Sequence, residues 1–146
     1  MMLFKNILVP YDDSECSLSA FKIAAEIAKK FNSKLTVLTV VPKSYYTDGF
    51  YTNVRYEEIL LKKQRDSANS ALSKVDSIAK KQGINLAKYV LESNAVVKQI
   101  VSFAKSEKFD LIVMGTHGRT GWNKLILGSV ANGVSQRVGC HVFLVR

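Results

Sequence analysis

Hydrophobic positions along the chain alternate between two spacings. Short, nearly continuous apolar runs rich in β-branched residues predict strands that are buried on both faces of a parallel sheet. Apolar residues at steps of three and four predict helices with one buried face. We expect strands at 4–10, 34–41, 85–93, 109–115 and 141–146, and helices at 14–31, 54–82, 94–107 and 128–138. This strict alternation predicts an α/β, three-layer sandwich with right-handed crossovers and helices on both faces of the sheet.

Local signals mark the helix ends. Asp13 or Ser14 can cap the first helix, and Asn94 the third, by accepting a hydrogen bond from a free backbone N–H. Gly83 stands where the second helix should stop. The expected buried stripes comprise Leu18, Phe21, Ala24, Ala25, Ala28 and Phe31 in the first helix and Ala68, Leu72, Val75 and Ala79 in the second.

The bulk composition is that of an ordinary globular chain. Its 146 residues, 47% of them hydrophobic, suffice for one core, so we expect a single domain over 1–146. No segment approaches the run of about 20 apolar residues that crosses a bilayer, so we expect no membrane partner. The first ten residues do not match a secretory signal, and we therefore expect a cytoplasmic protein.

Cysteine spacing and charge narrow the function classes. Cys16 and Cys140 fit no metal-binding spacing, and two histidines are too few to complete a structural metal site, so we expect reduced, packed cysteines and no metal. The net charge of +9 favours encounters with anions. The basic residues recur at helical intervals, however, which indicates solvated helix faces, so we expect no nucleic-acid partner.

Candidate ligand-binding residues follow two of the expected strands. Ligands of open α/β sheets bind beyond the carboxyl ends of the strands. Pro10 ends the first strand, and Asp12 follows where a carboxylate can reach ribose hydroxyls or a base amine. Alternatively, Asp12 and Asp13 serve only to cap the next helix.

The second strand end runs into a glycine-rich stretch, MGTHGRTGWNKLILGSV, at 114–130. A helix N-terminus has unpaired N–H groups and a partial positive charge, and glycines let phosphate oxygens come close to it. Ser129 would add a hydroxyl donor, while Arg119 and Lys124 could supply charge. The spacing is neither that of a Walker A loop nor that of a dinucleotide-binding G-x-G-x-x-G.

This stretch resembles the ATP-binding branch of the universal stress protein family, whose motif G-x2-G-x9-G-[ST] is matched by Gly115, Gly118, Gly128 and Ser129. The stretches KNILVPYDDSECS, DLIVMGTHGRTG, LGSVANGV and CHVFLVR are also similar to that family. The resemblance implies a Rossmann-like, five-stranded parallel sheet of order 3-2-1-4-5, as in adenine nucleotide alpha hydrolase-like folds. It implies ATP, with Mg²⁺ carried on the phosphates, between the first and fourth strands.

By the same resemblance, Pro10, Tyr11 and Val40 would line the adenine pocket, and Asp12 would contact the adenosine part. The glycine loop with Ser129 and Val130 would hold ribose and phosphates. The expected cofactor-binding residues of this stretch are Met114, Gly115, Thr116, His117, Gly118, Arg119, Gly128, Ser129 and Val130.

The resemblance also implies a homodimer paired through the last strand, where an apolar edge otherwise invites uncontrolled association. Three features depart from the family pattern: His141 replaces a frequent proline, Gly133 interrupts the last helix, and ESNAVV lacks a Gly-x-Pro.

Three functions follow as hypotheses. The first is an ATP-dependent regulator in stress response with slow or no hydrolysis and a protein partner that the sequence does not identify. The second is a phosphohydrolase or nucleotidyl-transfer enzyme that depends on His117, for which a locally hydrogen-bonded loop histidine is the alternative. The third is a nucleic-acid module that uses the aromatics of 42–53 (Tyr45, Tyr46, Phe50 and Tyr51), for which a loop folded onto its own domain or its dimer mate is the alternative.

Overall fold

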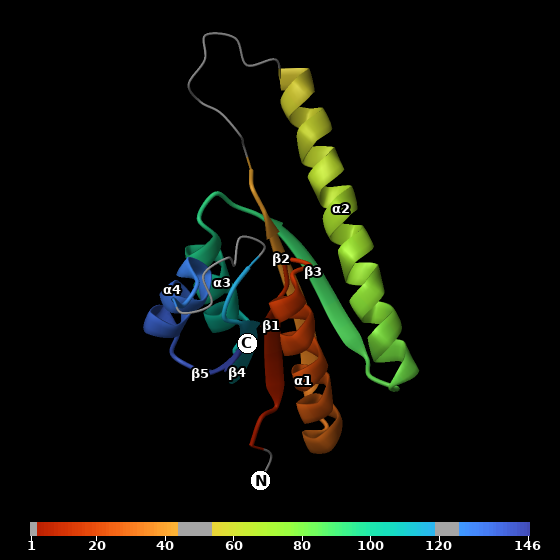
Figure 1. The fold of residues 1–146 in the computed structure, drawn as a ribbon, viewed down its shortest axis with the longest axis vertical. Helices are drawn as coiled ribbons and strands as arrows, with labels where there is room; N and C mark the ends of the chain where they lie inside the picture. Colours follow the sequence, from red (N-terminus) through yellow and green to blue (C-terminus); the bar gives the residue numbers. More distant parts are fainter. Residues whose placement is uncertain (1–2, 44–53, 119–125) are drawn as a thin grey trace.

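The computed structural model describes residues 3–43, 54–118 and 126–146. Within them, a parallel sheet is formed by β1 (Asn6–Pro10), β2 (Lys34–Val41), β3 (Leu86–Glu92), β4 (Leu111–Gly115) and β5 (His141–Val145). The strands lie in the order β3-β2-β1-β4-β5 (Figure 1). This confirms the α/β class and the implied order. Because order reverses between β1 and β4, the carboxyl ends of these strands flank the place where such sheets bind ligands.

Helices cover both faces of the sheet. The helix α1 (Glu15–Phe31) and the 28-residue α2 (Val54–Lys81) pack on one face, and α3 (Val96–Ser106) and α4 (Ser129–Arg137) pack on the other (Figure 1). Two separate clusters of buried side chains result, one on each face. The expected stripe of α2 is buried, whereas Leu18 and Phe31 at the ends of the expected stripe of α1 are only half-buried.

The helix ends confirm two of the expected signals and correct a third. Ser14 caps α1, with its Oγ accepting from Ser17 N at 3.1 Å, and Gly83 follows α2 with a left-handed φ of +71°. The prediction that Asn94 caps α3 is wrong. Ala95 takes the N-cap position, and Asn94 Oδ1 accepts from Lys43 N at 2.9 Å, so it ties the segment after β2 to the segment after β3.

Gly133 lies inside α4 for a packing reason. A Cβ built at this position would come within 2.8 and 2.9 Å of the two methyl groups of Val97 on α3. The absence of a side chain therefore lets α3 and α4 approach each other closely, which offsets the usual penalty of about 1 kcal/mol for glycine within a helix.

Asp110 joins the amino-terminal ends of β1 and β5 through hydrogen bonds. Its carboxylate accepts from Lys5 N at 2.8 Å and from Asn6 N at 3.2 Å, and its carbonyl accepts from His141 N at 3.3 Å. The nearby Cys140 is half-buried, and burial together with the Asp110 charge raises the pKa of its thiol. Cys140 and Cys16 are both free.

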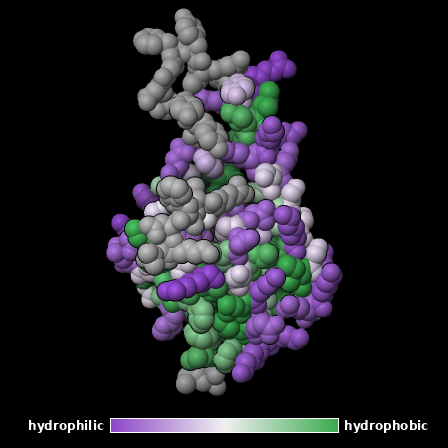
Figure 2. Space-filling model, in the orientation of Figure 1, coloured by the Kyte–Doolittle hydropathy of each residue, from purple (hydrophilic) through white to green (hydrophobic). Residues whose placement is uncertain are grey.

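Charged side chains dominate the exposed side of α2. Asp76 pairs with Lys88 of β3 at 3.1 Å and with Lys80 at 3.2 Å, and these two ammonium groups lower the pKa of its carboxyl. Figure 2 shows hydrophilic residues along the margin where α2 lies and hydrophobic residues gathered lower on the same face. Among the described residues, no helix is long and apolar enough to span a bilayer.

Candidate functional site

A cavity of about 600 Å³ opens at the carboxyl ends of β1, β2 and β4. Its volume falls within the range of about 300–1,000 Å³ that is typical of small-molecule and cofactor sites. Every sequence-predicted site residue that the structure describes lines it: Pro10, Tyr11, Asp12, Val40, Met114, Gly115, Thr116, His117, Gly118, Gly128, Ser129 and Val130. Arg119 lies outside the described residues, as do Lys124 and the aromatics Tyr45, Tyr46, Phe50 and Tyr51.

The segment after β1 presents Asp12 to the cavity. Tyr11 N donates to Leu38 O at 2.9 Å, and Thr39 Oγ1 donates to Tyr11 O at 2.9 Å, so the main chain is fixed to β2 just before Asp12. Asp12 Oδ1 accepts from Ser14 N at 3.0 Å. The carboxylate thus stabilises the turn into α1, as the capping alternative holds, while it also lines the cavity.

The side chain of Tyr11 belongs largely to the core instead of the cavity. It is 4% exposed, packs in the cluster under α1 and α2, and donates its hydroxyl to Asp13 Oδ1 at 3.0 Å. Asp13 has a left-handed φ of 63° and also pairs with Lys74 of α2 at 3.3 Å. Tyr11 and Asp13 therefore hold the loop that carries Asp12.

Each glycine of the motif allows a close approach between protein atoms. A Cβ at Gly115 would lie 2.7 Å from Cys16 Cβ, and one at Gly128 would lie 2.7 Å from Thr116 O. At Gly118, a Cβ would lie 2.7 Å from Asp12 Oδ2. The glycine spacing predicted only a close approach of phosphate, but protein atoms also come close at these positions, and Gly118 brings the two site segments into contact.

The N-terminus of α4 opens into the cavity with free donors. Gly128 occupies the N-cap without a side-chain cap, and the first turn contains no acidic residue. The first intrahelical bond runs from Asn132 N to Gly128 O at 2.9 Å, so the N–H groups of Ser129, Val130 and Ala131 have no intrahelical acceptor. These three residues line the cavity. Free amides and the helix dipole together favour an anion there.

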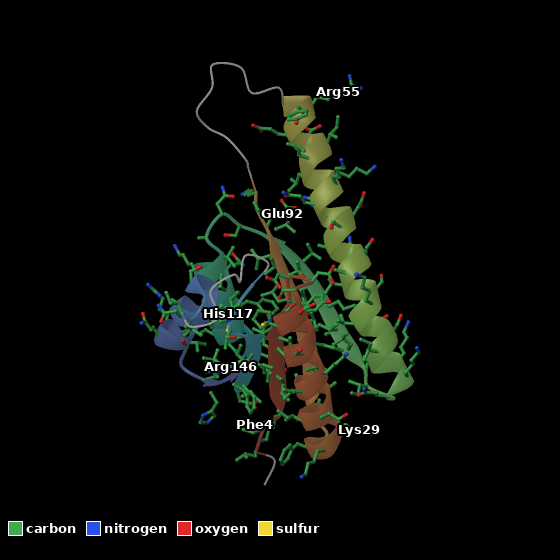
Figure 3. The ribbon with its side chains drawn as sticks, in the orientation of Figure 1. Phe4, Lys29, Arg55, Glu92, His117 and Arg146 are labelled. Carbon is green, nitrogen blue, oxygen red and sulfur yellow. The ribbon has the colours of Figure 1, made fainter. Side chains whose placement is uncertain are left out.

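His117 uses both ring nitrogens for hydrogen bonds. Nδ1 lies 2.8 Å from Thr116 Oγ1, and Nε2 lies 2.5 Å from Ile126 O. The residue is at the carboxyl end of β4, on the side of α3 and α4 (Figure 3). This arrangement is the locally hydrogen-bonded histidine that we weighed against a catalytic base, since neither nitrogen is left to accept a proton from water.

Part of the cavity wall was missed by the sequence argument. Leu38 of β2 and Val96 and Ile100 of α3 were not predicted, and together with the predicted Met114 of β4 they give the cavity an apolar side. The sequence placed Val96 and Ile100 only within the expected helix at 94–107, and no signal in the sequence separates a core position from a cavity wall. The other added lining residues are Ser14, Ser17, Ile126, Leu127 and Ala131.

Comparisons with known proteins agree on one family. The model of the universal stress protein family matches residues 3–146. The chain is 36% identical over 144 residues to a universal stress protein of Methanocaldococcus jannaschii, which covers 99% of this chain and 83% of the relative. Its fold matches that of UspA from Lactobacillus plantarum with a TM-score of 0.87, at 28% identity over 98% of each chain.

A further solved structure carries a ligand. It is a universal stress protein in complex with cAMP, and it matches this chain with a TM-score of 0.68 at 25% identity, over 99% of this chain and 98% of the other.

Proposed function

The chain belongs to the universal stress protein family, and from this premise we propose that it binds ATP in the cavity and acts as a nucleotide-dependent regulator in stress response. The observation that carries this proposal is the uncapped N-terminus of α4, whose three free amides belong to residues that line a cavity with an apolar wall. An adenine nucleotide has the matching chemistry, with a flat apolar base at one end and a polyanion at the other.

We assign the parts of the nucleotide by chemistry. The apolar wall formed by Leu38, Val40, Val96, Ile100 and Met114 suits the base. Asp12 suits the ribose, because a carboxylate accepts hydrogen bonds from hydroxyls and repels phosphate. The α4 amides and the Ser129 hydroxyl suit the phosphates, and Mg²⁺ would be carried on those phosphates, since no cluster of three metal-ligating side chains occurs among the described residues.

Hydrolysis is expected to be slow or absent. In-line attack on a γ-phosphate requires a group that orients water and a charge that stabilises the transition state. The bonds of His117 to Thr116 and Ile126 occupy its nitrogens. We therefore expect the bound nucleotide to act by its presence, and a steady release of ADP by pure protein would favour the enzyme hypothesis instead.

The test begins with protein purified without added nucleotide. Mass spectrometry of the denatured sample should detect a retained adenine nucleotide, and calorimetry of the stripped protein should show binding of ATP with magnesium. AMP and cAMP belong in the same titration series, because a structural relative is a complex with cAMP. Absence of heat with all adenylates, on a sample with the expected circular dichroism spectrum, contradicts the proposal.

We also propose that the protein forms a homodimer through β5. This strand is at the edge of the sheet, it pairs only with β4 among the described residues, and its Phe143 is 46% exposed. An exposed apolar edge strand is a template for pairing with an identical edge across a two-fold axis. Light scattering should give twice the monomer mass, and Phe143→Lys should shift it toward the monomer; a wild-type monomer at high concentration contradicts this assignment.

A further inference from the structure

The strongest unassigned feature of the site is the bonding of the His117 ring. A carbonyl oxygen can only accept, so Nε2 must carry the proton that is donated to Ile126 O at 2.5 Å. In the neutral ring Nδ1 then accepts from the Thr116 hydroxyl at 2.8 Å. The ring therefore joins a residue before the 118–125 stretch to a residue after it.

The anchor of this arrangement is Thr116. It is 8% exposed, its N–H donates to Val145 O of β5 at 2.8 Å, and its carbonyl accepts from Gly128 N at 2.8 Å. The two bonds Thr116 O to Gly128 N and His117 Nε2 to Ile126 O are thus neighbours, and they close the base of the same stretch. Gly128 permits the first bond, because a Cβ there would come within 2.7 Å of Thr116 O.

We propose that His117 is a positioning residue: its bond to Ile126 O joins the end of β4 to the segment that enters α4, and so holds Gly118 and the α4 N-terminus on the same cavity. The expected effect on nucleotide affinity rests on the proposed function, whereas the bond between His117 and Ile126 forms without a ligand. Because the bond already fixes Gly118 and the α4 N-terminus relative to each other, less conformational entropy is lost when a nucleotide binds, so the bond strengthens binding without touching the phosphates.

Side-chain geometry supplies matched variants. Glutamine places an amide N–H near the position of Nε2, so His117→Gln should keep the bond to Ile126 O. Asparagine reaches only as far as Nδ1, so His117→Asn should lose it, as should His117→Ala. We expect the Asn and Ala variants to bind ATP about tenfold more weakly than the wild type, and the Gln variant to stay within about threefold, because a neutral hydrogen bond contributes modestly to a loop's stability.

A second readout tests the closure without nucleotide. The Gly128 amide donates to Thr116 O next to the His117 bond, so its hydrogen exchange, followed by NMR on the stripped protein, reports whether the base of the loop opens. Exchange should be about tenfold faster in His117→Ala and His117→Asn and close to wild type in His117→Gln. The exchange of Val113, inside β4, should be unchanged in all three variants and serves as the control for global unfolding.

The possible outcomes distinguish the closure by the His117 bond from its effect on nucleotide affinity. If Gly128 exchanges at the same rate in the wild type and in His117→Ala, the closure is refuted, whatever happens to affinity. If exchange rises while the affinity for ATP is unchanged, the positioning role is refuted. If all three variants bind ATP normally but lose hydrolysis, His117 is catalytic and the inference is wrong. If the wild type binds no adenylate, the proposed function fails, and the exchange comparison alone still decides whether His117 closes the loop.

Discussion

Gly118→Ala should weaken nucleotide binding through Asp12. The new Cβ would lie 2.7 Å from Asp12 Oδ2, which is closer than nonbonded atoms approach, so the carboxylate must turn away. Because the displaced atom is the end of a movable side chain, the fold should survive. The expected loss is one charge-assisted hydrogen bond to the ribose, worth about 1.5–3 kcal/mol, which corresponds to about 10- to 150-fold in the dissociation constant.

Calorimetry with ATP, adenosine and inorganic triphosphate measures where the loss occurs. Gly118→Ala and Asp12→Ala should both weaken adenosine and ATP and leave triphosphate nearly unchanged. Gly139→Ala is the matched control, since a Cβ at Gly139 would have no atom within 4 Å. We expect this control to bind like the wild type.

A double-mutant cycle distinguishes Asp12 from the phosphates as the group that the new methyl crowds. If Gly118→Ala acts through Asp12, it should add less than about 0.5 kcal/mol in the Asp12→Ala background, because the carboxylate is already gone. Full additivity, or an equal loss for adenosine and triphosphate, would show that the methyl group meets the phosphates directly and would refute the orientation proposed for the nucleotide.

Three further predictions concern stability. Gly133→Ala should lower the free energy of unfolding in urea by about 1–3 kcal/mol through its contact with the stiff Val97 side chain, and Val97→Ala should restore it; equal stability of Gly133→Ala and wild type would contradict the packing argument. Asp110→Ala should lower the free energy of unfolding by about 1–2 kcal/mol, and Asp110→Asn by less, because the amide oxygen can still accept; an identical loss for both would mean that charge alone matters. Because the folded state lowers the pKa of Asp76, its ionised carboxylate stabilises the fold above the ordinary pKa of 3.8, and this stabilisation is lost as the pH falls through the folded-state pKa. Lys88→Met should therefore raise the Asp76 pKa in an NMR titration and reduce the loss of unfolding free energy in acid. An unchanged Asp76 pKa would exclude Lys88 as the cause.

The sequence by itself determined the elements and their alternation. Apolar spacing is a local property of helices and strands, so it predicted all the elements that the structure describes and erred by only a few residues at their ends. The placement of Asp12 after β1 and of Gly118 after β4 at one edge of the sheet likewise followed from the rule that strand carboxyl ends meet there. The strand order and the expectation of an adenine nucleotide came from the family resemblance, since spacing along the chain does not specify which strands become neighbours.

Only the tertiary structure decided which groups touch across long sequence separations. Asn94 has the chemistry of a cap, yet its oxygen accepts from Lys43, 51 residues away. By spacing, Gly118 is a candidate for phosphate contact, yet in the structure it faces Asp12. By residue type, His117 is a candidate base, yet its Nε2 donates a hydrogen bond to Ile126 O. Such contacts depend on how close the packed strands and helices bring particular atoms, and hydrogen bonds and steric overlap change within tenths of an ångström, a scale that residue type and spacing do not encode.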